Sequence, residues 1–283
     1  MLLVATASLV VAVRVRLLEV PLDRDEGEYA YVGQQWLQGI PPFASIYHVK
    51  LPGIYAVYAA IEALLGQTVA GIRTGLLAVN LASGAVLFAI ARRFFGPLAS
   101  ALAASVFALL TLGQELDGFS ANAEHFVLLP ALLGWLALLA APGARHERGL
   151  VFLSGLGLGL AIAIKQQGVF FAAAAAVFGV AFAWAERPRQ LARRVRDGGA
   201  FAFGAALPFA TLCAGFAALG LFDRFWWWTW YYPRRYVSEI SWSDAWANFW
   251  HSFHPAGELA GVFDAHGPLL VLAAAGALWL LLS

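Results

Sequence analysis

The sequence predicts an all-α membrane protein, a polytopic bundle of transmembrane helices with interfacial helices in its first external loop. Of its 283 residues, 61% are hydrophobic and only 12% are charged, whereas a soluble domain is about 25% charged. The apolar residues gather in long runs, which is typical of a chain that has lipid as its solvent. No alternating barrel pattern is visible, so these runs are expected to be helices that satisfy their own backbone groups.

The apolar runs define the candidate spans, roughly at residues 2–20, 68–91, 98–113, 124–141, 150–165, 168–185, 200–221 and 267–283. Arg14 and Arg16 follow the first run instead of preceding it, which favours an uncleaved membrane helix over a signal peptide. The chain stops inside the last run, so we expect one transmembrane domain over residues 1–283 that is incomplete at its C-terminus.

The charges give an orientation. Arginine is concentrated at residues 92–93, 145–148 and 186–198, and the positive-inside rule places these loops in the cytoplasm. Alternation then puts four acidic or aromatic segments outside: residues 21–67, 114–123, the turn near Lys165, and 222–266. Long loops have room to build a site, so we expect the chemistry on the external face. The basic residues form no aromatic-interleaved patch, which excludes a nucleic-acid partner.

The first external loop begins with the segment PLDRDEGEYAYVGQQWLQGIPP. Asp25 and Glu28 have the spacing of a capping box, and a glycine and two prolines end the helix that follows. One face of that helix would carry Tyr29, Val32, Trp36 and Leu37. This pattern predicts a short amphipathic helix at the membrane surface with aromatic anchors.

A second short helix is predicted in the segment HVKLPGIYAVYAAIEALLG, from Pro52 to Gly66. At about 1.5 Å per residue it is too short to cross a bilayer. Its polar face would carry Tyr55, Tyr58 and Glu62, and the opposite face Ile54, Val57 and Ile61. We expect an interfacial or re-entrant helix whose polar face looks into a site, with Lys50 just before it.

Four carboxylates lie within six residues of this loop, at Asp23, Asp25, Glu26 and Glu28. Such a cluster raises the pKa values of its members by mutual repulsion, and Lys50 offsets only part of that repulsion. Asp25 could be only a helix cap and Lys50 only a snorkelling lysine, but the charge density favours a functional site. The carboxylates could also bind a divalent cation through their oxygens, although no cofactor is firmly predicted. Ligand spacing for a zinc site is absent from the sequence.

These segments resemble the start of membrane glycosyltransferases of the C-type superfold. The match is with the group of protein O-mannosyltransferases, aminoarabinose lipid A transferases and lipopolysaccharide-core transferases. Family members show an Asp-Glu pair after the first membrane helix, and then a Lys-Pro-Pro-like element before a short helix ending in Gly. Here Asp25-Glu26 match the pair and Lys50 with Pro52 matches the second element, although Leu51 replaces its first proline. The segment GLGLGLAIAIKQQG is similar to a Gly-rich helix followed by a lysine in the family, and the resemblance covers roughly residues 20–185.

The resemblance implies an inverting transfer of a sugar from a polyprenyl-phosphate donor to a lipid, glycan or protein acceptor at the external face of the plasma membrane. Asp25, next to Glu26, would be the catalytic base on the acceptor hydroxyl. The donor phosphate would be bound by Lys50, Lys165, Arg234 and Arg235. The candidate substrate-binding residues are Tyr29, Tyr55, Tyr58, Glu62, Glu124, His125 and Tyr236.

Several of these residues have a second interpretation. Glu124 and His125 open a membrane helix, where they are either site residues or an interfacial pair within reach of water. Lys165 either snorkels or holds a phosphate. Arg73, inside a span, requires a carboxylate or phosphate partner. The aromatic segment FDRFWWWTWYYPRRYVSEISW is typical of an interfacial belt, where aromatic rings and arginines could also bind a sugar or a phosphate.

The alternative function is a transporter or flippase for a lipid-linked or anionic solute. Such a protein would place its charges near the bilayer midplane, in broken helices and repeated halves. Here the charges gather in loops and at helix ends, and no internal repeat is visible.

Overall fold

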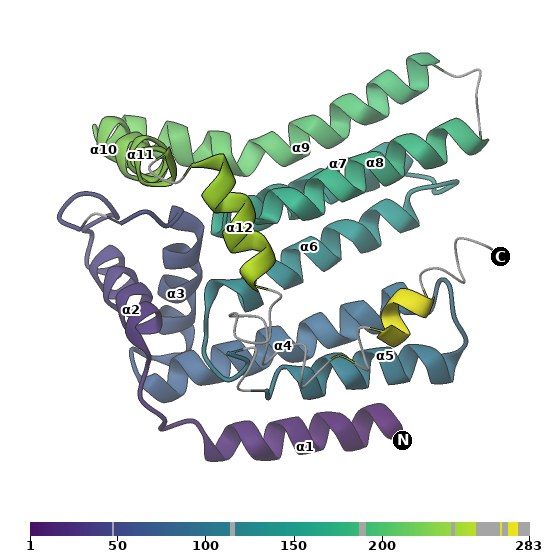
Figure 1. The fold of residues 1–283 in the computed structure, drawn as a ribbon, viewed down its shortest axis with the longest axis horizontal. Coiled ribbons are helices and arrows are strands. Elements are labelled where there is room, and N and C mark those ends of the chain that lie inside the picture. Colours follow the sequence, from purple (N-terminus) through teal and green to yellow (C-terminus); the bar gives the residue numbers. More distant parts are fainter. Residues whose placement is uncertain are drawn as a thin grey trace.

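The computed structural model describes residues 1–46, 48–113, 117–186, 191–238, 241–252, 267 and 271–276. In these residues the chain is helical and contains no strand, so the all-α prediction is confirmed (Figure 1). The helices are α1 (Leu2–Arg16), α2 (Arg24–Leu37), α3 (Pro52–Leu65), α4 (Val69–Ala91), α5 (Pro97–Leu110), α6 (Ala123–Ala140), α7 (Glu147–Ile164), α8 (Gly168–Glu186), α9 (Leu191–Ala218), α10 (Phe222–Trp226), the π-helix η2 (Trp227–Tyr231), α11 (Tyr232–Ser238) and α12 (Trp242–Ser252).

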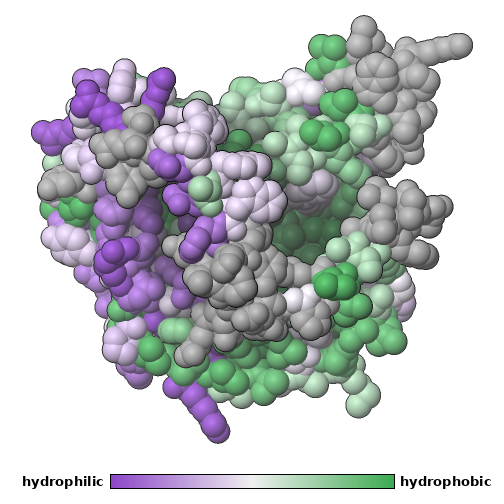
Figure 2. Space-filling model, viewed as in Figure 1, coloured by the Kyte–Doolittle hydropathy of each residue, from purple (hydrophilic) through white to green (hydrophobic). Residues whose placement is uncertain are grey.

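The long helices run roughly alongside one another, and α2 and α3 stand at one end of them (Figure 1). Within the described residues, four helices are long and apolar enough to cross a membrane: α4, α6, α7 and the part of α9 from Val195 to Ala218. α5 and residues 168–181 of α8 are shorter apolar helices. The expected last span, 267–283, lies mostly outside the described residues. Figure 2 shows hydrophilic surface gathered over α2 and α3, on the left of that view, and hydrophobic surface over the bundle.

Glycines in α7 explain how tightly the bundle packs. A Cβ on Gly157 would lie 2.7 Å from the Pro130 carbonyl oxygen of α6, and one on Gly159 would lie 2.3 Å from the Ala205 carbonyl oxygen of α9. Small residues allow this close backbone approach, on which helix association in lipid depends. The glycine-rich run is therefore a packing surface between two neighbours, and it brings Lys165, directly after α7, to the end where α2 and α3 lie.

Helix α2 is capped by Asp23, not by Asp25 as the sequence predicted. The Asp23 carboxylate accepts a hydrogen bond from the Glu26 backbone N–H at 2.8 Å, and Glu26 Oε2 accepts one from the Asp23 N–H at 2.9 Å. This is a complete capping box. Asp23–Glu26 and Asp25–Glu28 have the same spacing, so the spacing alone could not choose between them. Because Asp23 supplies the cap, the Asp25 carboxylate in the first helical turn is released from that role.

Helix α3 has the predicted bounds but not the predicted exposure. Its predicted polar face is buried, with Tyr55, Tyr58 and Glu62 at most 2% exposed, and Ile54 of the opposite face is 0% exposed. The helix packs against α2 on one side and against α4, α6 and α7 elsewhere. The helix forms as predicted, but the expectation that its polar face looks into an open site was wrong, because both faces find protein neighbours.

Candidate functional site

An ion pair between Asp25 and Lys50 lies where α2 begins and the chain enters α3. The Asp25 Oδ2 and Lys50 Nζ atoms are 2.8 Å apart, and the two side chains are 27% and 25% exposed. Arg24, almost fully exposed, reaches the other oxygen of Asp25 at 3.2 Å. The Tyr29 hydroxyl donates to Asp25 Oδ2 at 3.4 Å, and the Tyr29 ring centroid is 5.6 Å from Lys50 Nζ. The pair is thus packed against Tyr29 on one side and partly exposed on the other.

The protonation states of these groups follow from their neighbours. Partial burial raises the pKa of the Asp25 carboxyl, but Lys50 and Arg24 lower it by more, so its pKa ends below the ordinary value. Burial lowers the pKa of Lys50, whereas Asp25 and Tyr29 raise it to a final value of about 12. Burial raises the pKa of Tyr29 to about 12. At neutral pH the site therefore holds a carboxylate, an ammonium and a neutral phenol.

The loop between α2 and α3 positions Lys50. Phe43 in this loop has a left-handed backbone with φ of 67°, a strained conformation for a bulky residue. Its ring packs against Phe216 and Phe225, with centroids 5.4 and 5.7 Å away. Next to Lys50, the preceding backbone carbonyl accepts a hydrogen bond from Gln166 Nε2 at 3.3 Å. Aromatic packing at one point and a hydrogen bond at another therefore fix the path of the loop.

A second ion pair, between Glu124 and Lys165, lies at the same end of the bundle. Glu124 is in the first turn of α6 and Lys165 follows the last turn of α7. Lys165 is 20% exposed, whereas Glu124 is 63% exposed. The positive charge of Lys50 also acts on the Glu124 carboxylate, so the two pairs are electrostatic neighbours. The structure thus brings together Asp25, Lys50, Glu124 and Lys165, all of which the sequence predicted as site residues.

The Glu26 side chain points to α4 instead of to this cluster. It is 0% exposed and forms an ion pair with Arg73 of α4, and it also accepts a hydrogen bond from the Ala121 backbone N–H. Arg73 donates further to the Phe119 carbonyl oxygen at 2.7 Å. The expectation that Arg73 requires a carboxylate or phosphate partner is confirmed, and the partner is the carboxylate of Glu26. Because both oxygens of Glu26 are used and buried, we leave Glu26 out of the catalytic set.

Five predicted substrate-binding residues are buried; Tyr29 and Tyr55 contact carboxylates of α2, and the other three, Tyr58, His125 and Glu62, lie in packed regions away from the Asp25–Lys50 pair. The Tyr58 hydroxyl donates to the Ala121 carbonyl oxygen at 2.7 Å. His125 is buried, with Nδ1 3.1 Å from the Asn80 side-chain oxygen. Helical spacing gave the shared face of Tyr58 and Glu62, and the sequence placed His125 at the start of a membrane helix. It could not show that protein, instead of substrate, packs against them.

Glu62 is the third of these buried residues, at the contact between α3 and α2. Gln34 Nε2 donates a hydrogen bond to its Oε1 at 3.4 Å, while Oε2 has no hydrogen-bond partner among the residues that the structure describes. A Cβ on Gly33 would lie 2.6 Å from Oε2, so α2 closes directly over the carboxyl group. Burial raises the pKa of Glu62 to about 7, because the charged form is poorly solvated there.

The predicted phosphate ligands of the aromatic segment remain separate from this cluster in the described contacts. Arg234 and Arg235 lie on α11, and the Arg235 guanidinium lies 5.7 Å from the Trp227 ring centroid. Exposed rings lie on η2 and at the start of α11, at Trp227, Trp230, Tyr231 and Tyr232. The side chain of Tyr236 lies outside the described residues. The aromatic setting fits the interfacial belt that the sequence predicted.

Sequence reasoning missed a polar cluster that joins α2, α3 and the loop. His48 Nε2 lies 2.8 Å from Glu28 Oε2, and the Tyr55 hydroxyl donates to Glu28 Oε1 at 2.7 Å. The available signal was an ionisable His48 two residues before Lys50. Glu28 was instead assigned to a capping box.

The four carboxylates at the start of α2 do not converge on one point. Asp23 caps the helix, Asp25 pairs with Lys50, Glu26 with Arg73, and Glu28 with His48. Among the residues that the structure describes, no group of three or more His, Cys, Asp or Glu side chains could hold a metal ion. The mutual repulsion expected from the sequence is therefore offset by separate partners.

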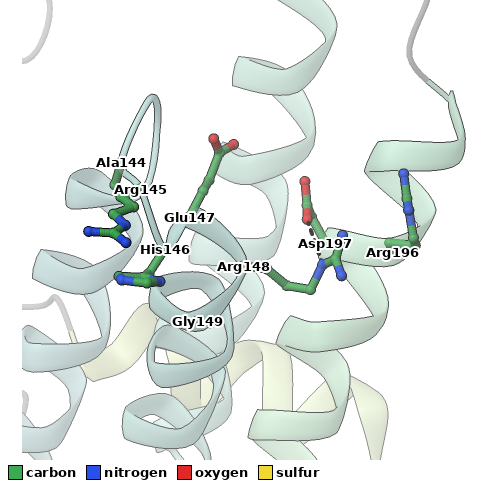
Figure 3. Close-up of a pocket in the computed structure, with 8 residues that line it drawn as sticks. All are labelled: Ala144, Arg145, His146, Glu147, Arg148, Gly149, Arg196 and Asp197. Atoms are coloured by element: carbon green, nitrogen blue, oxygen red, sulfur yellow. Dashed lines mark ion pairs between the residues drawn. The ribbon is translucent and has the colours of Figure 1, made fainter.

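A pocket of about 510 Å³ lies at the other end of α7. Figure 3 shows its lining from the loop before α7, the first turn of α7, and α9. Arg148 and Asp197 form an ion pair across it at 3.6 Å, drawn as a dashed line (Figure 3). Helix α7 has 18 residues, so this pocket is about 27 Å from Lys165 along the helix. It belongs to the arginine-rich end and not to the Asp25–Lys50 site.

The fold and the site define a polytopic helical membrane protein with paired lysines and carboxylates at one end of its bundle. The family model for dolichyl-phosphate-mannose-protein mannosyltransferase matches residues 49–213, which is more than half of the chain. The chain belongs to the dolichyl-phosphate-mannose-protein mannosyltransferase family, and this membership indicates a membrane glycosyltransferase. The match includes Lys50, Glu124 and Lys165 and begins after Asp25. The comparisons with curated proteins and with solved structures find no match.

Proposed function

We propose that the protein transfers a sugar from a polyprenyl-phosphate donor to a hydroxyl group of a lipid, glycan or protein acceptor, with inversion at the anomeric carbon. The observation that carries the proposal is the partly exposed Asp25–Lys50 pair. A base and a cation side by side are what such a transfer requires, because one group accepts the acceptor proton and the other stabilises a phosphate leaving group. The family membership supports the same chemistry.

Asp25 is the proposed general base. The acceptor oxygen attacks the anomeric carbon, its proton passes to the Asp25 carboxylate, and the bond from that carbon to the phosphate oxygen breaks. While Lys50 is paired with Asp25, the low pKa of the carboxyl makes it a weak base. A donor phosphate offers Lys50 a stronger anionic partner. Once Lys50 turns to the phosphate, the Asp25 pKa rises and the carboxylate becomes a better base.

Lys50 and Lys165 are the proposed phosphate ligands. Each is paired with a carboxylate in the structure, so donor binding exchanges one anionic partner for another. Two cations arranged in advance stabilise the charge that develops on the departing polyprenyl phosphate. Arg234 and Arg235 stay predictions, because none of their described contacts joins them to this site.

We further propose that this site faces the exterior of the plasma membrane. The arginine-bearing segments at residues 92–93 and 145–148 lie at the opposite end of the long helices from α2 and α3, which supports that orientation through the positive-inside rule. The grouping of the two ion pairs at helix ends, away from the middle of the spans, favours transfer over the transporter alternative.

The test is a transfer assay with washed membranes and a panel of radiolabelled polyprenyl-phosphate sugars. Wild-type protein should give acceptor-linked product with at least one donor. The Lys50→Met protein should fold and insert normally but bind a polyprenyl-phosphate analogue at least about tenfold more weakly, as expected for a lost charge-assisted contact. Equal affinities of the two proteins would remove Lys50 from the site. A folded wild-type protein that binds the analogue but transfers no sugar would favour the transporter.

A further inference from the structure

The loop that carries Lys50 is attached to α2 at two neighbouring points. Lys50 pairs with Asp25, and His48, two residues earlier, pairs with Glu28. Asp25 and Glu28 are three residues apart and so lie on the same face of α2. Both contacts are 2.8 Å long. The loop and the helix are thus joined in register by two parallel contacts.

The two contacts differ in what surrounds them. One oxygen of Asp25 is held only by Arg24, which is 96% exposed, whereas the two oxygens of Glu28 are held by His48 and by the hydroxyl of the buried Tyr55. Burial and the nearby Glu28 charge raise the pKa of Tyr55 above its ordinary value, so this hydroxyl stays protonated and donates. Glu28 therefore joins the loop, α2 and α3 at one point.

The His48 ring is held chiefly through Glu28. Its Nδ1 atom is buried and finds no hydrogen-bond partner among the described residues, so Nε2 makes the ring's polar contact. The ring also borders a small space lined by Val32, Phe43 and Ile46. A ring packed on its apolar sides and bonded at one nitrogen can anchor a loop.

We propose that the Glu28–His48 pair is a positioning device that keeps Lys50 over the site when Lys50 leaves Asp25 for the donor phosphate. This inference rests on the proposed function. When Lys50 changes partner, the Asp25 contact between loop and helix is lost, and the Glu28–His48 contact remains. The loop then keeps its register, and the ammonium group stays within reach of the phosphate. His48 acts through Lys50 and does not itself touch the donor.

Two substitutions separate the polar anchor from simple packing. His48→Phe keeps a planar ring between the apolar neighbours but cannot bond to Glu28. His48→Gln keeps an N–H donor that can reach a carboxylate. We expect His48→Phe to raise the donor KM and the dissociation constant of a polyprenyl-phosphate analogue about tenfold, the scale of one charge-assisted hydrogen bond. The kcat should change less than about threefold, and His48→Gln should recover most of the lost affinity. His146→Ala, at the far end of α7, is the matched control and should leave the donor KM unchanged.

A double-mutant cycle with Lys50→Met decides how His48 acts. If His48 works through Lys50, adding His48→Phe to Lys50→Met should weaken analogue binding no further, because the two effects share one group. Additive losses would overturn the inference, and so would an unchanged donor KM in His48→Phe or a loss confined to kcat. If Lys50→Met itself binds the analogue as well as wild type, the proposed phosphate site fails instead, which keeps the two failures distinct.

Discussion

The Glu26 carboxylate and the Arg73 guanidinium form a buried ion pair, with Oε2 and Nη2 2.9 Å apart. Asp25, the next residue back along the chain, is instead 27% exposed and pairs with Lys50. Successive residues on an α-helix point about 100° apart, so adjacent carboxylates can serve different purposes. One carboxylate joins α2 to α4, and the other is left for the site.

Replacing either member of the buried pair should lower the stability of the fold, and any loss of transfer activity should follow from that loss of stability. Glu26→Gln and Arg73→Met each leave one buried charge without its partner, which typically costs about 3–5 kcal/mol. Thermal unfolding in detergent should show a large loss of stability for both variants. A Glu26→Gln protein with wild-type stability and no transfer activity would show instead that Glu26 takes part in the reaction.

Buried Glu62 should make stability depend on pH. Its pKa is raised from 4.5 to about 7 in the folded protein, so the unfolded chain loses this proton first as pH rises. The contribution of Glu62 to the free energy of unfolding is then fully present below about pH 4.5 and is lost as the pH rises through about 7. Glu62→Gln has no carboxyl group to titrate at this position. Between pH 5 and pH 8 its Tm should therefore fall less than that of the wild type, by about a few degrees. Equal changes of Tm with pH in the two proteins would argue against a raised pKa of Glu62.

Much of the architecture could be predicted from sequence, and much of the site could not. Long apolar runs located α4, α6 and α7 within a few residues, because hydropathy and helix length are local properties. The Glu124–Lys165 pair joins residues 41 apart in the chain, and only the packing of α6 on α7 brings them together. For the same reason Glu62 looked like a site residue: its spacing gives its face, but not the Gly33 backbone that covers it.

Orientation is tested by labelling single cysteines from outside intact cells. The background is Cys213→Ser, which removes the one native cysteine. Ser45→Cys, in the loop between α2 and α3, should react with an impermeant maleimide, whereas Ala144→Cys, before α7, should react only after the membrane is opened. Labelling of position 144 in intact cells, with position 45 protected, would reverse the proposed topology.

The capping role of Asp23 predicts that neighbouring aspartates respond differently to substitution. Asp23→Ala removes the side-chain cap of α2 and should lower stability by about 1 kcal/mol. Asp23→Asn, an equally good cap, should restore most of that stability. Unfolding curves of the two purified variants provide the measurement. Equal stability of Asp23→Ala and wild type would mean that this cap contributes nothing.

The proposed catalytic role of Asp25 is tested most directly by the rate of sugar transfer in the Asp25→Asn protein. Asp25 does not cap α2, and it is partly exposed. The substitution should therefore leave thermal stability close to wild type while removing the group that accepts the proton. Loss of a general base typically lowers the rate about 10²–10⁴-fold. We expect a loss in that range in kcat, with the donor analogue still bound. Transfer by a folded Asp25→Asn protein at close to the wild-type rate would contradict the account.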